Sequence, residues 1–243
     1  MPPFRLTTMD QRCRLFEAAG VDAVYLIEFT RETAAIGAEE FVTRWLGERI
    51  GAKAAVTGQD FTFGRARGGT VVDLKAMGAA IDMDAEAVGS VSDAGGVISS
   101  TRIRQALRDG DPREAARLLS RPFAIEGIVQ HGDKLGRTIG YPTANLDLAD
   151  YVRPAYGVYA VRGHLVGGCV LDGAANLGIR PTFDPPKELL EPYFFDFSAD
   201  LYGRSVEIEL IEYLRPEATF DTLDVLKAQI GRDCERVRAI LAN

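Results

Sequence analysis

The stretch His131-Gly-Asp-Lys-Leu-Gly-Arg-Thr-Ile-Gly-Tyr-Pro-Thr-Ala-Asn145 concentrates glycines and cations more than any other part of the chain. Its glycines and cations are Gly132, Gly136, Gly140, Lys134 and Arg137. Glycine permits positive φ and a close approach to a ligand, so successive N–H groups can surround an anion. We interpret the stretch as a nucleotide phosphate site. A simple glycine-rich hairpin is the alternative, because glycine spacing alone is a weak motif.

The end of the same stretch predicts a cation site. Pro142 fixes the backbone immediately before Thr143 and Asn145, whose side-chain oxygens alternate along the chain. Oxygen ligands suit a hard cation such as Mg²⁺. Thr143 and Asn145 are therefore the candidate metal ligands.

This region resembles the signature of riboflavin kinase, which is most often the C-terminal half of bacterial bifunctional FAD synthetases. The resemblance rests on an ordered series of motifs: Gly132-x-x-x-Gly-Arg-x-x-Gly-x-Pro-Thr-Ala-Asn145, Gly157-Val-Tyr159, Asn176-x-Gly178-x-x-Pro-Thr-Phe183, Glu191-x-x-x-x-Asp-Phe197, Asp200-Leu-Tyr-Gly203 and Leu214-Arg215. Such a series is far more specific than the glycines alone.

The resemblance implies transfer of the ATP γ-phosphoryl group to the 5′-hydroxyl of riboflavin, which gives FMN and ADP. It implies that Mg²⁺ is required and that Glu191 orients or deprotonates the attacking hydroxyl. An ordinary surface glutamate is the alternative for Glu191. Where the family often has histidine two residues later, this chain has Tyr193, which puts an accessory role of that histidine in doubt.

Composition narrows the class of protein. The chain has 243 residues, 47% of them hydrophobic, which is enough for two domains with their own cores. Its formal net charge of −7 argues against nucleic-acid binding, because a nucleic-acid binder needs a basic face. The three cysteines are far apart and no apolar run reaches 18 residues, so we expect a cytoplasmic protein that is not membrane-bound. The oligomeric state is left open.

The first half alternates helical and strand patterns. Thr8 begins a capping box, the near-continuous apolar run from Ala23 to Phe29 predicts a buried strand, and a helix should end at Gly51 before a strand from Ala54 to Thr57. This alternation predicts an open parallel sheet of the Rossmann type within residues 1–119.

Ligands of such sheets bind beyond the carboxyl ends of the strands. The segments at 58–69 and 98–104 resemble the nucleotide site of the family's nucleotidyltransferase half. The candidate nucleotide-binding residues there are Asp60, Ser100, Thr101 and Arg104. N-capping of a helix is the alternative for the hydroxyl residues.

The second half, residues 120–243, changes to strand periodicity. Val206, Ile208 and Leu210 alternate with glutamates, and residues 123–129 alternate in the same way. We also expect short strands at 158–161, 165–171 and 193–197. Antiparallel strands must protect their edges, which favours a small barrel, and the resemblance implies six strands. A C-terminal helix capped by Asp221 should pack on the barrel.

The first half of the sequence departs from the family pattern in one respect. The nucleotidyltransferase half normally opens with a strand, a loop with a His-x-Gly-His-type motif and a helix, and no such segment precedes Pro2. We therefore expect FMN synthesis without FAD synthesis. Retention of both activities is one alternative, and a flavin-binding protein without turnover is another.

Overall fold

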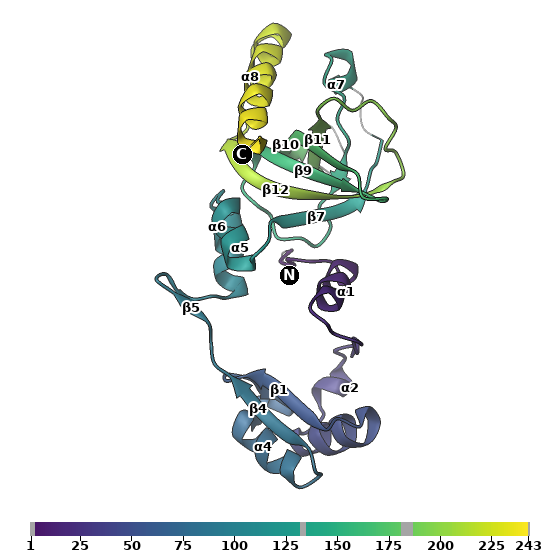
Figure 1. Ribbon diagram of the computed structural model, residues 1–243, viewed down its shortest axis with the longest axis vertical. Helices are drawn as coiled ribbons and strands as arrows, with labels where there is room; N and C mark the ends of the chain where they lie inside the picture. Colours follow the sequence, from purple (N-terminus) through teal and green to yellow (C-terminus); the bar gives the residue numbers. More distant parts are fainter. Residues whose placement is uncertain (1–2, 132–134, 181–186, 243) are drawn as a thin grey trace. The chain divides into compact units, whose positions relative to one another are not determined.

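The computed structural model describes residues 3–131, 135–180 and 187–242 and divides the chain into two compact units. One unit consists of Met1–Val21 and Ser99–Asn243, and the other of Asp22–Ile98. Figure 1 shows the strands of the first unit curving into a barrel beside helix α8.

The barrel has six antiparallel strands in the spatial order β7-β12-β9-β10-β11-β8. Their bounds are β7 (Phe123–Ile128), β8 (Leu146–Asp147), β9 (Gly157–Leu165), β10 (Val170–Arg180), β11 (Lys187–Phe194) and β12 (Ser205–Arg215). The two outer strands approach each other where Gln130 bridges Asn145, so the barrel is nearly closed. The predicted six-stranded barrel is confirmed.

Alternating side chains build the barrel core. In β12, Val206, Ile208 and Leu210 are buried, whereas the glutamates between them are partly exposed. A fully buried aliphatic side chain of this kind contributes roughly 1.5–3 kcal/mol. The alternation predicted for β7 is wrong at Ala124, which is buried together with Phe123 and Ile125 because a helix covers that side of the strand.

Two of the predicted short strands differ from the structure. Residues 166–169 form the turn between β9 and β10, where Gly167 and Gly168 have φ values of 99° and 86°. These angles favour glycine and leave a hairpin turn where one strand was predicted. Strand β11 ends at Phe194, so the strand expected at 193–197 is only the end of a longer one.

The helices of this unit are α1 (Met9–Ala18), α5 (Ser100–Arg108), α6 (Pro112–Leu119), α7 (Leu135–Thr138) and α8 (Leu223–Leu241). Thr8 forms the predicted capping box with Gln11. The buried amide of Gln11 then donates to the Ala124 carbonyl, and Arg113 of α6 pairs with Glu212. Helices α1 and α6 therefore pack on the barrel. As a result, the compact units differ from the expected domains, residues 1–119 and 120–243. That division into domains stays a prediction.

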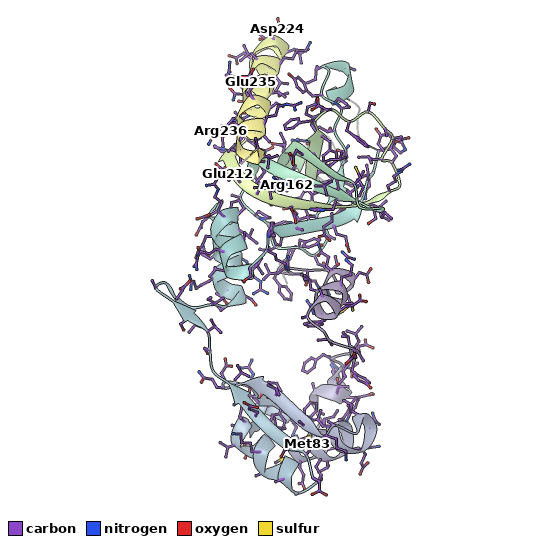
Figure 2. The ribbon with its side chains drawn as sticks, in the orientation of Figure 1. Met83, Arg162, Glu212, Asp224, Glu235 and Arg236 are labelled. Atoms are coloured by element: carbon purple, nitrogen blue, oxygen red, sulfur yellow. The ribbon has the colours of Figure 1, made fainter. Side chains whose placement is uncertain are left out.

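Helix α8 is fastened to the barrel at several points. The Arg215 guanidinium donates to the Asp233 carboxylate, with distances of 2.7 to 3.2 Å. Arg162 of β9, labelled in Figure 2, donates to the Leu241 carbonyl at the helix C-terminus (3.0 Å). The helix begins after Thr222, whose hydroxyl accepts from the Val225 N–H. The predicted cap, Asp221, is therefore one residue too early, because Thr222 caps the helix.

The second unit is a small α/β arrangement. Its parallel strands β1 (Ala54–Gly58) and β4 (Asp84–Val88) are joined through α4 (Val71–Ala79). A parallel α/β arrangement was predicted for this half, with β1 as one of its strands, but α4 and β4 were not predicted. Its core includes Leu74 and Met83, the latter labelled in Figure 2. The other elements are α2 (Arg31–Ala34), α3 (Ala38–Glu40), the π-helix η1 (Phe41–Ile50), β2 (Thr62–Phe63), the 3-10 helix η2 (Arg65–Arg67), β3 (Gly69–Thr70), β5 (Ser92–Asp93) and β6 (Gly96–Val97).

The strand predicted from Ala23 to Phe29 is wrong. These residues are in no strand and are exposed, with Phe29 exposed to 86%. A strand needs a hydrogen-bonding neighbour, and β1 and β4 pair only with each other among the described residues. Within those same residues, the structure contains no helix with the length and apolar character needed to cross a lipid bilayer.

We expect Asp233→Asn to destabilise the barrel unit by about 2 kcal/mol, because a partly buried guanidinium loses its anionic partner. In a chain of this size such a loss lowers Tm by about 4–8 °C. Glu235→Gln, on the exposed side of the same helix, is the matched control (Figure 2). Thermal unfolding followed by circular dichroism measures both variants, and equal Tm values for the two would contradict the assigned role of the ion pair.

Candidate functional site

Three polar side chains lie in a row across neighbouring strands of the barrel. The register pairs Asn176 of β10 with Glu191 of β11, and Leu190 of β11 with Leu146 of β8. Continuing the second register by one residue sets Asn145 opposite Glu191. Directly paired residues point to the same face with Cβ atoms about 4.5–5.5 Å apart. The candidate base and a candidate metal ligand are therefore neighbours.

The backbone of the Thr143–Asn145 segment is fixed to the barrel. The Ala144 N–H donates to the Pro192 carbonyl (2.9 Å), and the Gln130 N–H donates to the Asn145 carbonyl (2.8 Å). The Asn145 side chain is buried, and its amide forms no hydrogen bond within residues 3–131, 135–180 and 187–242. A buried amide that lines a cavity without a protein partner is suited to bind a ligand or an ion.

The glycine-rich stretch folds back on itself next to this segment. Gly140 has φ of 89°, as predicted, but Gly136 is glycine for another reason. A Cβ at Gly136 would collide with the Tyr141 carbonyl, and the Tyr141 N–H donates to the Gly136 carbonyl (2.8 Å). The predicted residues Gly132 and Lys134 lie outside the described residues, and of Arg137 only the backbone, in α7, is described.

These elements surround a cavity of about 490 Å³. Its walls come from the glycine-rich stretch, the outer face of β10 and β11, the segment after β12, and α8; Figure 1 shows α7 and α8 extending from the same end of the barrel. Its polar lining includes Thr143, Asn145, Asn176, Arg180, Glu191 and Glu217. The structure therefore brings Gly136, Thr143, Asn145 and Glu191 together around one space.

The other side of the cavity is apolar and aromatic. Tyr141 and Tyr193 meet edge to face with ring centroids 5.3 Å apart, and Leu226, Ile230 and Cys234 of α8 complete the wall. Burial raises the pKa of the Cys234 thiol to about 11, so the thiol is neutral at physiological pH. A neutral wall of this kind can cover a flat, weakly polar ring.

Glu191 is engaged by a cation that the sequence did not single out. The Arg180 guanidinium forms an ion pair with the Glu191 carboxylate and reaches Glu217 with its other terminal nitrogen (3.5 Å). Glu217 also accepts from the Asn176 amide (3.0 Å). The side chains of Glu191 and Arg180 are 17% and 32% exposed, so solvent screens this pair incompletely.

The remaining predicted residues are not part of the lining of this cavity. Asp60 is exposed in the second unit, whereas Ser100, Thr101 and Arg104 belong to α5 in the first. Helix α5 is capped by Ser99, which confirms N-capping for that hydroxyl. Arg104 donates to the Phe4 carbonyl (2.7 Å), and the nucleotide-binding role of these residues stays a prediction.

A metal at this site would have few protein ligands. Among the described residues, no group of three or more histidine, cysteine, aspartate or glutamate side chains could hold an ion. Neutral oxygens from Thr143 and Asn145 suit an ion that takes most of its ligands from water and from phosphate oxygens, which is the coordination typical of Mg²⁺.

Two family models match this chain. The family model for riboflavin kinase matches residues 119–241, and the model for FAD synthetase matches residues 1–102.

Similar proteins match almost the whole chain. The bifunctional riboflavin kinase/FMN adenylyltransferase of Escherichia coli K12 is 42% identical over 95% of this chain and 74% of its own length. The enzyme of the same description from Bacillus subtilis is 35% identical over 100% and 77%. A crystal structure described as a macrolide-efflux protein from Streptococcus pneumoniae is 37% identical, covers 97% of this chain and 76% of its own, and has a TM-score of 0.87.

The similarity thus includes the ordered motifs of the barrel, the matches to both family models, and identity to known enzymes along nearly the full chain. The motifs that carry the barrel's resemblance are the same segments that line the cavity. The chain therefore belongs to the family of bifunctional riboflavin kinase/FMN adenylyltransferases, and its barrel is the riboflavin kinase part.

Proposed function

We propose that this chain transfers the γ-phosphoryl group of ATP to the 5′-hydroxyl of riboflavin and releases FMN and ADP. The observation that carries the proposal is the position of Glu191 on β11 at the wall of one cavity. Asn176 of β10 pairs with it on one side, and the continued register of β8 sets Asn145 opposite it on the other. Phosphoryl transfer needs an oriented hydroxyl, neutralised phosphate charge and a held metal within a few ångströms of one another.

Glu191 is the proposed general base. Its carboxylate accepts the proton of the ribityl hydroxyl as the new O–P bond forms and the bond to the ADP oxygen breaks. The charge that develops on the phosphoryl oxygens needs fixed positive groups nearby, and the predicted cations Lys134 and Arg137 would supply part of this charge. The glycine-rich stretch binds the ATP phosphates through its backbone N–H groups.

Thr143 and Asn145 would hold Mg²⁺ between the protein and the ATP phosphates. The buried Asn145 amide at the cavity wall supports this fit. When bound, the ion would neutralise phosphate charge and orient the γ-phosphoryl group. The aromatic and apolar wall is suited to the flavin ring, and the cavity volume lies within the roughly 300–1,000 Å³ typical of small-molecule sites.

FMN adenylyl transfer, giving FAD, is the second candidate function. The match of residues 1–102 to FAD synthetase favours it, and Asp60, Ser100, Thr101 and Arg104 are its candidate nucleotide-binding residues. A flavin-binding protein without turnover is a third reading. Cytoplasmic location and the absence of nucleic-acid partners remain predictions from the sequence.

One experiment separates these functions. The protein is incubated with riboflavin and Mg-ATP, and the flavins are resolved by chromatography. FMN is the expected product. FAD in addition to FMN would support the second function, which supplying FMN and Mg-ATP directly and assaying pyrophosphate would test. Unchanged riboflavin, bound but not phosphorylated, would contradict the proposed kinase.

Glu191→Gln should lower kcat by about 10²–10⁴-fold while the Kd for riboflavin changes little, because the amide cannot accept the hydroxyl proton. Glu209→Gln, on β12 and outside the described lining of the cavity, is the matched control. Steady-state kinetics and riboflavin titration measure the two effects. A Glu191→Gln variant with wild-type kcat would rule out the proposed base.

Thr143→Ala and Asn145→Ala should each weaken Mg²⁺-dependent ATP binding more than metal-free riboflavin binding, because each removes an oxygen at the proposed ion. Calorimetric titrations with and without Mg²⁺ measure the difference. If either variant weakens both ligands equally, the residue supports the fold of the site and does not hold the ion.

A further inference from the structure

Arg180 lies between two carboxylates at the cavity wall. One terminal nitrogen pairs with Glu191, and the other lies 3.5 Å from Glu217. Glu217 follows β12 in the sequence, whereas Arg180 ends β10 and Glu191 lies in the middle of β11. Three segments of the chain therefore meet at one guanidinium.

The face of β10 is shaped to receive the Glu217 carboxylate. Asn176, Gly178 and Arg180 alternate along the strand and therefore share one face. Asn176 and Arg180 both approach Glu217, and a Cβ at Gly178 would overlap its carboxylate. The glycine thus makes room for the contact, and the arrangement holds Arg180 beside Glu191.

Arg180 also differs from Arg215, the other cation in the described lining of the cavity. The described lining contains Arg180 and Arg215, and Arg215 is bound to the buried Asp233 through three hydrogen bonds. Arg180 instead contacts two partly exposed carboxylates. A guanidinium with such partners can exchange one of them for another anion at low cost, because solvent and the second carboxylate compensate the change.

The proposed chemistry places an anion within reach. A hydroxyl that donates to Glu191 lies about 2.5–3 Å from the carboxylate, and the phosphorus that it attacks is about 3–3.5 Å further away. The transferring phosphoryl group therefore lies roughly 6 Å from Glu191. Arg180 is already in contact with Glu191, so a phosphoryl group at this distance on the Arg180 side of Glu191 is within reach of the guanidinium after a change of side-chain rotamer.

Resting on the proposed function, we propose that Arg180 changes partner during catalysis. In the free enzyme it neutralises Glu191 and stays anchored by Glu217. With riboflavin and ATP bound, it donates to the transferring phosphoryl group and leaves the Glu191 carboxylate free to accept the hydroxyl proton. Arg180 is thus a catalytic residue: by the same movement it frees the Glu191 carboxylate to act as the base and stabilises the negative charge on the phosphoryl oxygens.

The alternative is that Arg180 only ties β10 to the segment after β12. The two roles differ in what Glu217→Gln does. If Arg180 acts only through its link to Glu217, Arg180→Gln and Glu217→Gln break that link and should have similar effects, and binding of a phosphoryl-transfer analogue should not depend on Arg180. If Arg180 acts on the phosphoryl group, Glu217→Gln keeps the guanidinium and should reduce activity far less.

The test compares kcat, KM and ligand Kd for wild type, Arg180→Gln, Arg180→Lys and Glu217→Gln. We expect Arg180→Gln to lose about 10²–10³-fold in kcat, as is typical when one transition-state donor is removed. Its Kd values for riboflavin and Mg-ATP should change little. Arg180→Lys should fall between, because it keeps the charge without the planar fork.

A second measurement does not depend on turnover. Mg-ADP with aluminium fluoride imitates the transferring phosphoryl group, and with riboflavin present it should bind Arg180→Gln much more weakly than wild type, while Mg-ADP alone binds both equally. Equal losses of kcat in Arg180→Gln and Glu217→Gln, or unchanged analogue binding, would overturn the inference alone. A wild-type enzyme that forms no FMN would overturn the proposed function and this inference together.

Discussion

The site depends above all on the register in which β8, β10 and β11 are aligned. Pairing of Asn176 with Glu191 and of Leu190 with Leu146 fixes which side chains face the cavity and which face the barrel core. Since side chains alternate along a strand, a slip of one residue would turn Glu191 into the core and expose Leu190. The buried Leu177 and Leu190 therefore fix the register by their own burial, and so place the polar row on the opposite face.

Helix α8 turns that outer face into a cavity. The C-terminal half of the helix packs on β9 through Val237 and Leu241, which are buried together with Val158 and Ala160. Its first half contributes Leu226 and Ile230 to the cavity wall. Helix α8 thus covers the apolar end of the outer face of the barrel and leaves the polar end accessible. The Arg215–Asp233 ion pair lies between the two halves of the helix.

The sequence predicted the elements that depend on local chemistry. The Thr8 capping box, the helix end at Gly51 with φ of 71°, and the alternation of β12 all follow from neighbouring residues, and all are present. The ordered motifs around Gly136 and Asn145 identified the barrel and its cavity. Side-chain capping of α8 was predicted one residue too early, at Asp221 instead of Thr222, because aspartate and threonine are both good caps.

The features that could not be predicted from the sequence depend on contacts between residues far apart in the chain. Ala23–Phe29 has the apolar composition of a buried strand, but a strand forms only beside another strand, which the local sequence does not contain. Arg180 and Glu217 are separated by 37 residues and meet because the segment after β12 reaches the outer face of β10, although β9 lies between the two strands. The alternation of Asn176, Gly178 and Arg180 on β10 was the available signal for a polar face, but not for its partner.

A structure of the complex with riboflavin, Mg²⁺ and ADP is the most direct test of the central claim that phosphoryl transfer takes place in the cavity beneath α8. The account predicts the ribityl 5′-hydroxyl within hydrogen-bond distance of the Glu191 carboxylate, the metal on the oxygens of Thr143 and Asn145, and the ADP phosphates against the glycine-rich stretch. A flavin bound outside this cavity, or a 5′-hydroxyl directed away from Glu191, would contradict it.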